Sequence, residues 1–499
     1  KRRYFLISRG LFFVQWTLSY RYKDNAAPTI QNISFFIKKG EVVVLTGRSG
    51  CGKSTLFRCI NGLCPHFFEG EKKGNIYLNG KESTPLRICD ISRLVASVFQ
   101  NPESQFFTAD VLSDLVYACE NYGVPKGEIE MRLNRIASML SLSPLIGKKI
   151  SELSGGEKQK VAIASTLMLN ADVLLLDEPS SNLDYQSIAL LKATLAELKS
   201  KGYTIIVIEH RLYYLADVCD RLIVFECGKM SRIYEGATLK AASNDELHLQ
   251  GLRGLHLFQN SISNPSTEKG SNPLLVLDNL FFGYEKLTNI LKGISFSVYP
   301  GDRIALIGKN GCGKTTLGKI LCGLIKEQQG CIRFMERPLS SRDRNRFASY
   351  VMQNVDFQLF GCSVYDDLLL GSERSPNIEN RIHSILSLLG LSSLESQHPT
   401  TLSMGQKQRL VIAASYLLNK RINVFDEPTS GLDYGNMKNV CDLIESITGN
   451  ENASIVITHD YEFILSVCNR VILLENGKIT RDFPLKDTTV LENIFKEKL

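Results

Sequence analysis

The 499-residue chain lacks several features that define common protein classes. No apolar run reaches the roughly 18 residues that a membrane-spanning helix requires. The 13 cysteines form no C-x-x-C pair, which excludes the zinc ribbons and iron–sulfur sites built on such pairs and favours reduced thiols. The net charge of +6 is too small and dispersed to indicate a nucleic-acid surface. With 44% apolar and 22% charged residues, the composition is that of a globular protein.

The chain contains a long internal repeat. Residues 47–54 read GRSGCGKS, and residues 308–315 read GKNGCGKT, an offset of 308 − 47 = 261. Shorter motifs also recur. Gln100 and Gln353 are separated by an offset of 253. Three further pairs share an offset of 249: LSGGE at 153–157 with LSMGQ at 402–406, DEP at 177–179 with DEP at 426–428, and His210 with His459. A constant offset over three motifs predicts two copies of one domain, and the change from 261 to 249 predicts deletions in loops of the second copy.

The repeat predicts the domain organisation. We expect an N-terminal extension at 1–13, a first domain at 14–240, a linker at 241–273 and a second domain at 274–499. Residues 259–273 are polar and rich in Pro, Gly and Ser, which is typical of a linker. In each copy, short β-branched runs alternate with helical patterns, which predicts a mostly parallel sheet covered by helices. The expected strands are 42–45, 173–176, 204–208 and 221–225, and then 304–307, 422–425, 454–457 and 470–474.

Each G-x-x-x-x-G-K-[ST] segment follows an apolar strand and begins a predicted helix, the context of a phosphate-binding loop. Backbone N–H groups of such a loop hold phosphate oxygens, the Lys reaches the terminal phosphates, and the hydroxyl binds Mg²⁺. Lys53 with Ser54, and Lys314 with Thr315, are predicted to take these roles. The alternative is a glycine-rich turn that binds no ligand. The presence of two copies in register makes this alternative much weaker.

Two acidic residues end a predicted strand in each copy, as phosphoryl transfer requires. Asp177 and Asp426 are expected at the carboxyl edge of the sheet beside the phosphate loop, where they would hold the metal. Glu178 and Glu427 would then orient the attacking water. His210 and His459 also follow strands, and their recurrence at the same offset favours a catalytic role over that of an ordinary surface histidine.

These residues together resemble the nucleotide-binding domains of ABC ATPases. LSGGE at 153–157 and LSMGQ at 402–406 are similar to that family's signature motif, and the resemblance covers about 450 residues, everything but the extension and the linker. It implies an α/β fold of tandem P-loop NTPase domains with RecA-like cores, each with an antiparallel β subdomain and a helical signature subdomain. The motif is also a capping box, which alone would explain its Ser and Glu or Gln.

The resemblance further implies two composite ATP sites formed by pairing of the two domains within one chain. The first would use Tyr22, Gly47, Arg48, Ser49, Gly50, Cys51, Gly52, Lys53, Ser54, Thr55, Gln100, Asp177, Glu178 and His210, closed by Ser403, Gly405 and Gln406. The second would use Tyr284, Gly308, Lys309, Asn310, Gly311, Cys312, Gly313, Lys314, Thr315, Thr316, Gln353, Asp426, Glu427 and His459, closed by Ser154, Gly155, Gly156 and Glu157. The implied cofactors are ATP and Mg²⁺, the metal ligands being Ser54, Gln100, Asp177, Thr315, Gln353 and Asp426.

Some positions carry more specific expectations. Tyr22 and Tyr284 match the aromatic residue that stacks on adenine, with Tyr20 as a second choice in the first copy. Met404 replaces the usual Gly and Glu157 the usual Gln of the signature. Because both positions vary in the family, the resemblance implies two hydrolytic sites rather than one.

The segment that begins at Gln100 reads QNPESQ, and the segment that begins at Gln353 reads QNVDFQ. This pattern and the EHRL run at 209–212 resemble the ATPases of energy-coupling factor (ECF) importers. That resemblance implies a peripheral subunit on the cytoplasmic face of the membrane, coupled to a T-type membrane scaffold and a small substrate-binding membrane subunit for a vitamin, cobalt or nickel. Asp114 and Asp367 would accept hydrogen bonds from a scaffold arginine. A twin sugar-importer ATPase and an ABC-type translation factor acting on ribosomes are the alternatives, and no nucleic-acid partner is expected.

Overall fold

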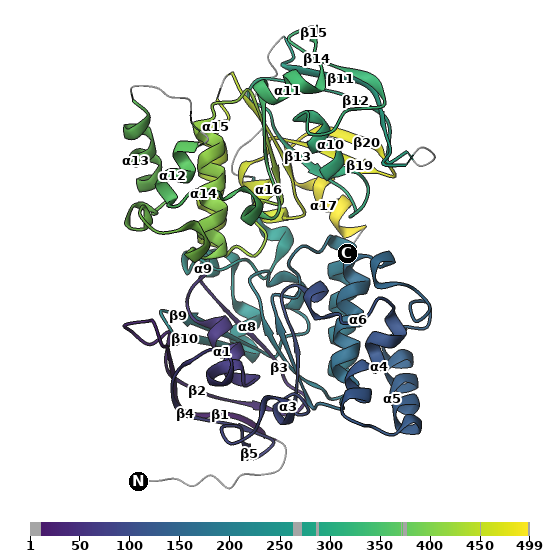
Figure 1. Ribbon diagram of the computed structural model, residues 1–499, viewed down its shortest axis with the longest axis vertical. Coiled ribbons are helices and arrows are strands. Elements are labelled where there is room, and N and C mark those ends of the chain that lie inside the picture. Colours follow the sequence, from purple (N-terminus) through teal and green to yellow (C-terminus); the bar gives the residue numbers. More distant parts are fainter. Residues whose placement is uncertain are drawn as a thin grey trace. The chain divides into compact units, whose positions relative to one another are not determined.

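The computed structural model describes residues 11–262, 272–285, 289–370, 372, 377–449 and 451–497, without the side chains of 11–17. The chain divides into two compact units, 1–256 and 257–499, and each is described by itself. Figure 1 labels many of their helices and strands.

The first unit contains a six-stranded sheet in the order β10-β9-β3-β8-β7-β6. All neighbouring strands are parallel except the β9–β10 pair at one edge. The central strands β3 and β8 are buried on both faces, as their uninterrupted apolar sequences predict. The bounds of the six strands are β3 Val42–Gly47, β6 Val95–Val98, β7 Val173–Asp177, β8 Thr204–Ile208, β9 Arg221–Glu226 and β10 Lys229–Glu235.

Alternate residues of this sheet belong to two different cores. Val42 and Val44 lie in the core on the side of the long helices α6 and α7, and Val43 and Leu45 lie in the core that contains α1 residues. Figure 1 shows α4, α5 and α6 grouped beside the sheet. The helices are α1 Lys53–Ile60, α2 Leu63–His66, α3 Ile88–Ile91, α4 Val111–Asn121, α5 Lys126–Met139, α6 Gly155–Leu167, α7 Tyr185–Ser200, α8 Gly236–Ala241 and α9 Asn244–Leu249.

A second, antiparallel sheet of the first unit has the order β2-β1-β4-β5. β1 pairs with β2 from Leu11↔Lys38 to Tyr20↔Ile30, with irregular register near Leu18. The strands are β1 Leu11–Tyr22, β2 Ile30–Lys38, β4 Gly70–Leu78 and β5 Lys81–Glu82.

The second unit repeats this architecture, with sheets ordered β16-β17-β18-β13-β19-β20 and β12-β11-β14-β15. Its strands are β11 Leu275–Phe282, β12 Leu291–Val298, β13 Arg303–Ile307, β14 Gln329–Phe334, β15 Arg337–Pro338, β16 Ala348–Val351, β17 Ile422–Asp426, β18 Ala453–Ile457, β19 Arg470–Glu475 and β20 Lys478–Pro484. Its helices are α10 Lys314–Leu321, α11 Ser341–Phe347, α12 Val364–Leu370, α13 Ile378–Leu388, α14 Met404–Leu417, α15 Tyr434–Ile447, α16 Tyr461–Val467 and α17 Thr489–Lys496.

The structure confirms the fold class, the eight expected parallel strands and the duplication. Part of the deletion in the second copy is now visible, because the described chain between α10 and β14 contains no counterpart of α2. The expected domain limits differ from the observed ones. β1 begins at Leu11, inside the predicted extension, and α9, at the start of the predicted linker, belongs to the first unit, which ends at His256. Residues 1–10 of the extension and 263–271 of the linker lie outside the described part.

Candidate functional site

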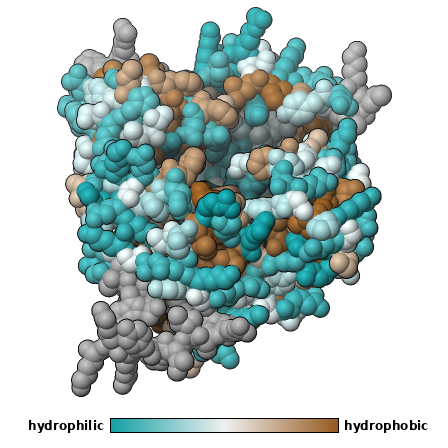
Figure 2. All heavy atoms as spheres, turned by 60° about the horizontal axis from the view of Figure 1, so that its bottom comes forward, coloured by the Kyte–Doolittle hydropathy of each residue, from teal (hydrophilic) through white to brown (hydrophobic). Residues whose placement is uncertain are grey.

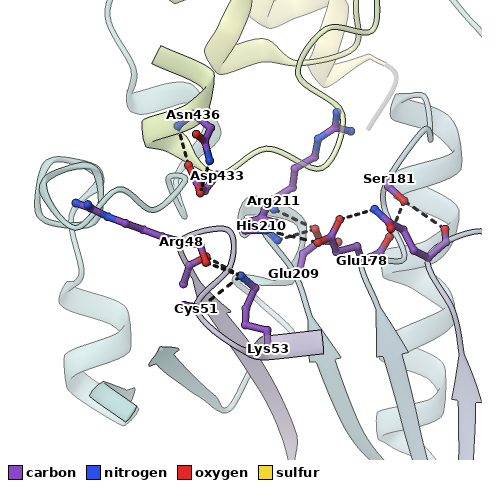
Figure 3. Close-up of polar contacts among 12 residues, drawn as sticks. Arg48, Cys51, Lys53, Glu178, Ser181, Glu209, His210, Arg211, Asp433 and Asn436 are labelled. Carbon is purple, nitrogen blue, oxygen red and sulfur yellow. Dashed lines mark hydrogen bonds and ion pairs between the residues drawn. The ribbon is translucent and has the colours of Figure 1, made fainter. Parts of the chain in front are cut away.

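The first phosphate loop follows β3 and leads into α1, as expected. Gly47 adopts φ 150°, and a Cβ atom there would lie 2.3 Å from the carbonyl oxygen of Phe225 on β9, so only glycine fits. The Lys53 ammonium lies inside the loop, donating to the carbonyl oxygens of Gly47 at 2.8 Å and Arg48 at 3.1 Å (Figure 3). These bonds hold a buried cation beside the N-terminus of α1, where phosphates bind.

The second phosphate loop has the same geometry. Gly308 adopts φ 151°, and a Cβ atom there would lie 2.1 Å from the carbonyl oxygen of Leu474. The Lys314 ammonium donates to Gly308 at 2.7 Å and Lys309 at 2.9 Å. Both loops therefore hold a lysine ammonium where it can reach a terminal phosphate.

Three of the predicted metal residues, Asp177, Thr315 and Asp426, offer oxygen atoms of the kind that Mg²⁺ binds. In the first unit, the Oδ1 atom of Asp177 is buried and has no hydrogen-bond partner among the described residues, and burial raises the pKa of Asp177 to about 6. In the second, the Thr315 hydroxyl donates to Oδ2 of Asp426 at 2.8 Å, so the two predicted ligands already meet. A hard divalent cation needs oxygen ligands of this kind, and one would satisfy the orphaned oxygen of Asp177. Ser54 lies exposed on the first turn of α1.

Glu178 is held at the edge of the sheet by three contacts. Its backbone adopts φ 44°, a left-handed conformation that is unfavourable for Glu, and its N–H donates to Ile208 at 2.8 Å. Gln100 Nε2 donates to Oε2 of Glu178 at 2.7 Å, and His210 Nε2 lies 3.5 Å from Oε1 (Figure 3). Glu427 repeats the conformation at φ 49°, with His459 Nε2 also 3.5 Å from Oε1. The structure thus brings together the catalytic pair predicted in each copy.

Burial controls the protonation of this pair in the first unit. Burial, together with the nearby carboxylates of Asp177 and Glu209, raises the pKa of Glu178 to about 8. Burial, followed by the positive charges of Lys53 and Arg253, lowers the pKa of His210 well below its usual range. At neutral pH the nucleotide-free site therefore holds a neutral imidazole beside a largely protonated carboxyl group.

Further residues, which the sequence did not single out, support the site in each unit. In the first unit, Oε1 of Glu209 accepts hydrogen bonds from the backbone N–H groups of His210 and Arg211, at 2.8 and 3.1 Å, and its Oε2 accepts from Tyr214 at 2.8 Å. In the second, Thr458 replaces Glu209, and Tyr350 donates to Oδ2 of Asp426 at 2.7 Å. The EHRL run at 209–212 contained a signal for Glu209, whereas nothing in the sequence marked Tyr350.

The signature motifs head α6 and α14 as capping boxes, confirming the predicted local structure. Ser154 N–H donates to Glu157 Oε2 at 2.8 Å, and Ser403 N–H donates to Gln406 Oε1 at 2.8 Å. A Cβ atom on Gly156 would lie 2.8 Å from that of Ser187 on α7. Met404, the departure from the family pattern, is 48% exposed, so its side chain disturbs no core.

The aromatic residues predicted at adenine lie near the helices that follow the phosphate loops. The Tyr22 hydroxyl is 3.2 Å from that of Thr55, and the Tyr284 hydroxyl is 3.3 Å from that of Thr316. Tyr284 is 62% exposed and free to stack on a base. Tyr20, the second choice in the first copy, is fully buried and donates to the carbonyl of Phe68, so it cannot take that role.

The structure also places four other predicted residues. Gln353 follows β16 as Gln100 follows β6, and Asn310 of the second phosphate loop contacts His459 at 3.1 Å. Asp114 and Asp367 are buried, and the Oδ1 atom of each already caps a loop: Asp114 accepts from Phe107 N at 2.9 Å, and Asp367 accepts from Phe360 N at 2.8 Å. Their contact with a membrane scaffold stays a prediction.

Two phosphate loops on RecA-like sheets, each with a strand-end Asp-Glu pair and a histidine, define a tandem P-loop ATPase. The family model for "ABC transporter" matches residues 30–181 and 291–430. The chain belongs to this family and is an ABC transporter ATP-binding protein with ATPase activity. Members of this kind pair with membrane subunits.

Similar proteins cover nearly the whole chain. A "Putative ABC transporter ATP-binding protein" of Treponema denticola is 65% identical over 485 residues, 97% of this chain and 99% of that one. A "Putative HMP/thiamine import ATP-binding protein YkoD" of Bacillus subtilis is 33% identical over 493 residues, 93% of this chain and 90% of that one. The solved structure titled "Model of ribosome-bound archaeal Pelota and ABCE1" matches with a TM-score of 0.70 at 23% identity, over 96% of this chain and 80% of that one. That likeness shows the tandem fold alone.

Lys53→Ala should remove the cation that meets the terminal phosphates of ATP at the first site. A hydrogen bond to a charged group contributes about 1.5–3 kcal/mol, so affinity at that site should fall by roughly tenfold or more. Equilibrium titration with a fluorescent ATP analogue would measure it, with Lys73→Ala on β4 as the control. Undiminished affinity in Lys53→Ala would refute the assignment of this loop.

Glu178→Gln should stabilise the nucleotide-free protein, and more so as the pH rises. The carboxyl has a folded-state pKa near 8 against 4.5 in the unfolded chain, so ionisation penalises folding increasingly from pH 4.5 up to about 8. The gain in Tm over the wild type should be about 2 °C or more near pH 8.5 and smaller near pH 5.5. Calorimetry at both pH values would test this. Glu120→Gln, on the exposed end of α4, should show no such trend, and the same Tm difference at both pH values for Glu178→Gln would contradict the account.

Proposed function

We propose that the chain is the motor subunit of an ECF-type importer, in which ATP-driven pairing of the two domains powers uptake of a micronutrient. The solute would be a vitamin, or cobalt or nickel, captured by a small substrate-binding membrane subunit and carried through a T-type membrane scaffold. The motor would lie at the cytoplasmic face of the membrane. No described helix is long and apolar enough to cross a membrane itself.

One observation carries this proposal: the second glutamine of the Q-N-x-x-x-Q segment has the same structural task in both units. Gln105 accepts from Phe99 N at 2.8 Å and donates to the Ser97 carbonyl at 3.0 Å. Gln358 accepts from Met352 N at 2.7 Å and donates to the Tyr350 carbonyl at 2.9 Å. Each side chain fixes the loop after the catalytic-site glutamine to the neighbouring sheet strand, so a partner bound to this loop would act directly on the ATP site.

The loop also presents an apolar surface that a membrane subunit could cover. Phe107 is 73% exposed and stacks on Tyr117 of α4 with ring centroids 5.0 Å apart, and Phe360 is 77% exposed in the second unit. Beside Phe107 and Tyr117 lies a cavity of 260 Å³, which also contacts Ile88 and Phe99. Figure 2 shows apolar residues gathered in patches among polar ones on the face that comes forward from the bottom of Figure 1. Such patches are typical of protein docking sites.

The similarity to an HMP/thiamine import protein supports a vitamin among the candidate solutes. The structural similarity to a ribosome-bound protein does not support the translation-factor alternative, since at 23% identity it concerns the fold alone.

In the proposed cycle, ATP lies on each phosphate loop and is closed by the signature residues of the other domain. The first site is completed by Ser403, Gly405 and Gln406, and the second by Ser154, Gly155, Gly156 and Glu157. When bound by Ser54, Gln100 and Asp177, or by Thr315, Gln353 and Asp426, Mg²⁺ neutralises charge on the phosphates. Glu178 and Glu427 orient the attacking water, and His210 and His459 hold these carboxyl groups in place. Product release lets the domains separate.

Both sites should hydrolyse ATP. Glu178→Gln and Glu427→Gln should each reduce the steady-state ATPase rate per chain by at least about half, because each removes the water-orienting carboxylate of one site. The rate of phosphate release from the purified chain would measure this. A wild-type rate in Glu427→Gln would contradict the presence of a second hydrolytic site.

Phe107→Ser should weaken association with the membrane subunits while leaving the basal ATPase rate of the isolated chain unchanged, because Phe107 lies on the docking surface. Affinity purification from native membranes, followed by mass spectrometry, would count recovered membrane subunits. Met131→Ser, 67% exposed on α5, is the matched control and should retain them. Equal recovery in both variants would refute this surface, and recovery of ribosomes in place of membrane proteins would overturn the transport function.

A further inference from the structure

The two helical subdomains differ in the contacts of one arginine that both contain. The offset of 249 residues persists here, since α5, α6 and α7 correspond to α13, α14 and α15. In the first unit, Arg132 on α5 forms an ion pair with Glu128, with Nε 3.1 Å from Oε1, and donates from Nη1 to the carbonyl of Met168 at 2.8 Å. Its side chain is 15% exposed. The charge of this arginine is therefore neutralised within its own domain.

In the second unit the arginine is kept and its acidic partner is lost. Arg381 occupies the position of Arg132 (132 + 249 = 381), Asn377 that of Glu128, and Ser446 that of Glu197. No described residue accepts a hydrogen bond or forms an ion pair with the Arg381 guanidinium in this structure. Ser384 replaces Arg135, whose guanidinium in the first unit contacts Asn170. The substitution at position 377 thus removes the carboxylate that pairs with this arginine in the first unit.

These changes leave a cavity of 390 Å³ between α13, α14 and α15. In the described part of the chain, its lining contains no Asp or Glu and consists of Asn377, Asn380, Arg381, Ser384, Ile385, Leu388, Tyr416, Leu443 and Ser446. A smaller cavity of 170 Å³ shares Arg381, Tyr416 and Ser446 with it and adds Lys420. The N-terminus of α13 also borders it, and the Asn377 side chain makes no cap there.

We propose that this cavity binds a small organic anion whose carboxylate or phosphate head group pairs with Arg381. The planar guanidinium matches either oxyanion with two parallel hydrogen bonds. Tyr416 and the side-chain amide of Asn380 offer further donors, and Leu388 and Leu443 line the part of the cavity that would contact an apolar body. The volume lies within the range of about 300–1,000 Å³ that is usual for small-molecule sites. The first unit does not offer this site, because its corresponding Arg132 already forms an ion pair with Glu128.

The test is protection of Arg381 from phenylglyoxal, which modifies free guanidinium groups, measured by mass spectrometry of the full-length chain. Both phosphate loops are first filled with a non-hydrolysable ATP analogue and Mg²⁺. Inorganic phosphate and benzoate are the probes, the first for a phosphate head group and the second for a carboxylate on an apolar ring. At least one probe should protect Arg381 in a saturable manner, while benzamide, which has the same ring without the charge, should not. The probe that protects Arg381 at the lower concentration identifies the preferred head group, phosphate or carboxylate.

Asn377→Glu is the matched variant, because it restores the acid that the first unit carries. The new carboxylate should pair with Arg381 and raise the half-protecting concentration of the probe by about tenfold, the cost of one charge-assisted hydrogen bond. Position 377 is exposed at a helix N-terminus, where an acid is favourable, so folding should be retained; Ser446→Glu provides a second variant of the same kind. Unchanged labelling of Arg381 with both probes, or equal protection in wild type and Asn377→Glu, would overturn the proposal.

Discussion

The close approach of each phosphate loop to the neighbouring strand is the constraint on which the rest of the site depends. Gly47 and Gly308 lie so near the carbonyl oxygens of Phe225 and Leu474 that no side chain fits. This approach turns the chain from β3 into α1, and from β13 into α10, with the lysine enclosed by loop carbonyls. Because the strands are parallel, the same edge of the sheet also receives the carboxylates of β7 and β17 and the histidines after β8 and β18. The chemistry is thus assembled by the topology of the sheet.

That assembly stores electrostatic free energy in the nucleotide-free state. Asp177, Glu178 and Glu209 lie together at a buried edge, and the raised pKa values of Asp177 and Glu178 record the cost of their charges. A Mg²⁺ ion held by Asp177 would bring a positive charge to this cluster. The two copies reach this arrangement differently: Glu209 fixes the backbone at His210, whereas Thr458 stands in its place and Tyr350 bonds to Asp426. The duplicated sites are alike in their reacting groups and different in what supports them.

Much of this was predictable from the sequence, because motifs that bind phosphate or end strands carry their geometry locally. The glycine pattern, the apolar strands and the capping boxes each follow from neighbouring residues, and the structure confirms them. Contacts that depend on tertiary packing were not predictable. Tyr350 forms a hydrogen bond with Asp426, which lies 76 residues further along the sequence. Tyr20 is excluded from the adenine site because the antiparallel sheet around it buries its side chain. The domain limit was missed for a similar reason, since α9 looks like linker sequence but packs on the first unit through Leu247.

The central claim is that the two domains of one chain form two ATP sites that close together. The most direct measurement is the number of ATP molecules retained per chain by the Glu178→Gln, Glu427→Gln double variant after rapid removal of free nucleotide. The account predicts two, because in the proposed cycle each nucleotide would be held by the phosphate loop of one domain and the signature helix of the other. Retention of one ATP or none would contradict it.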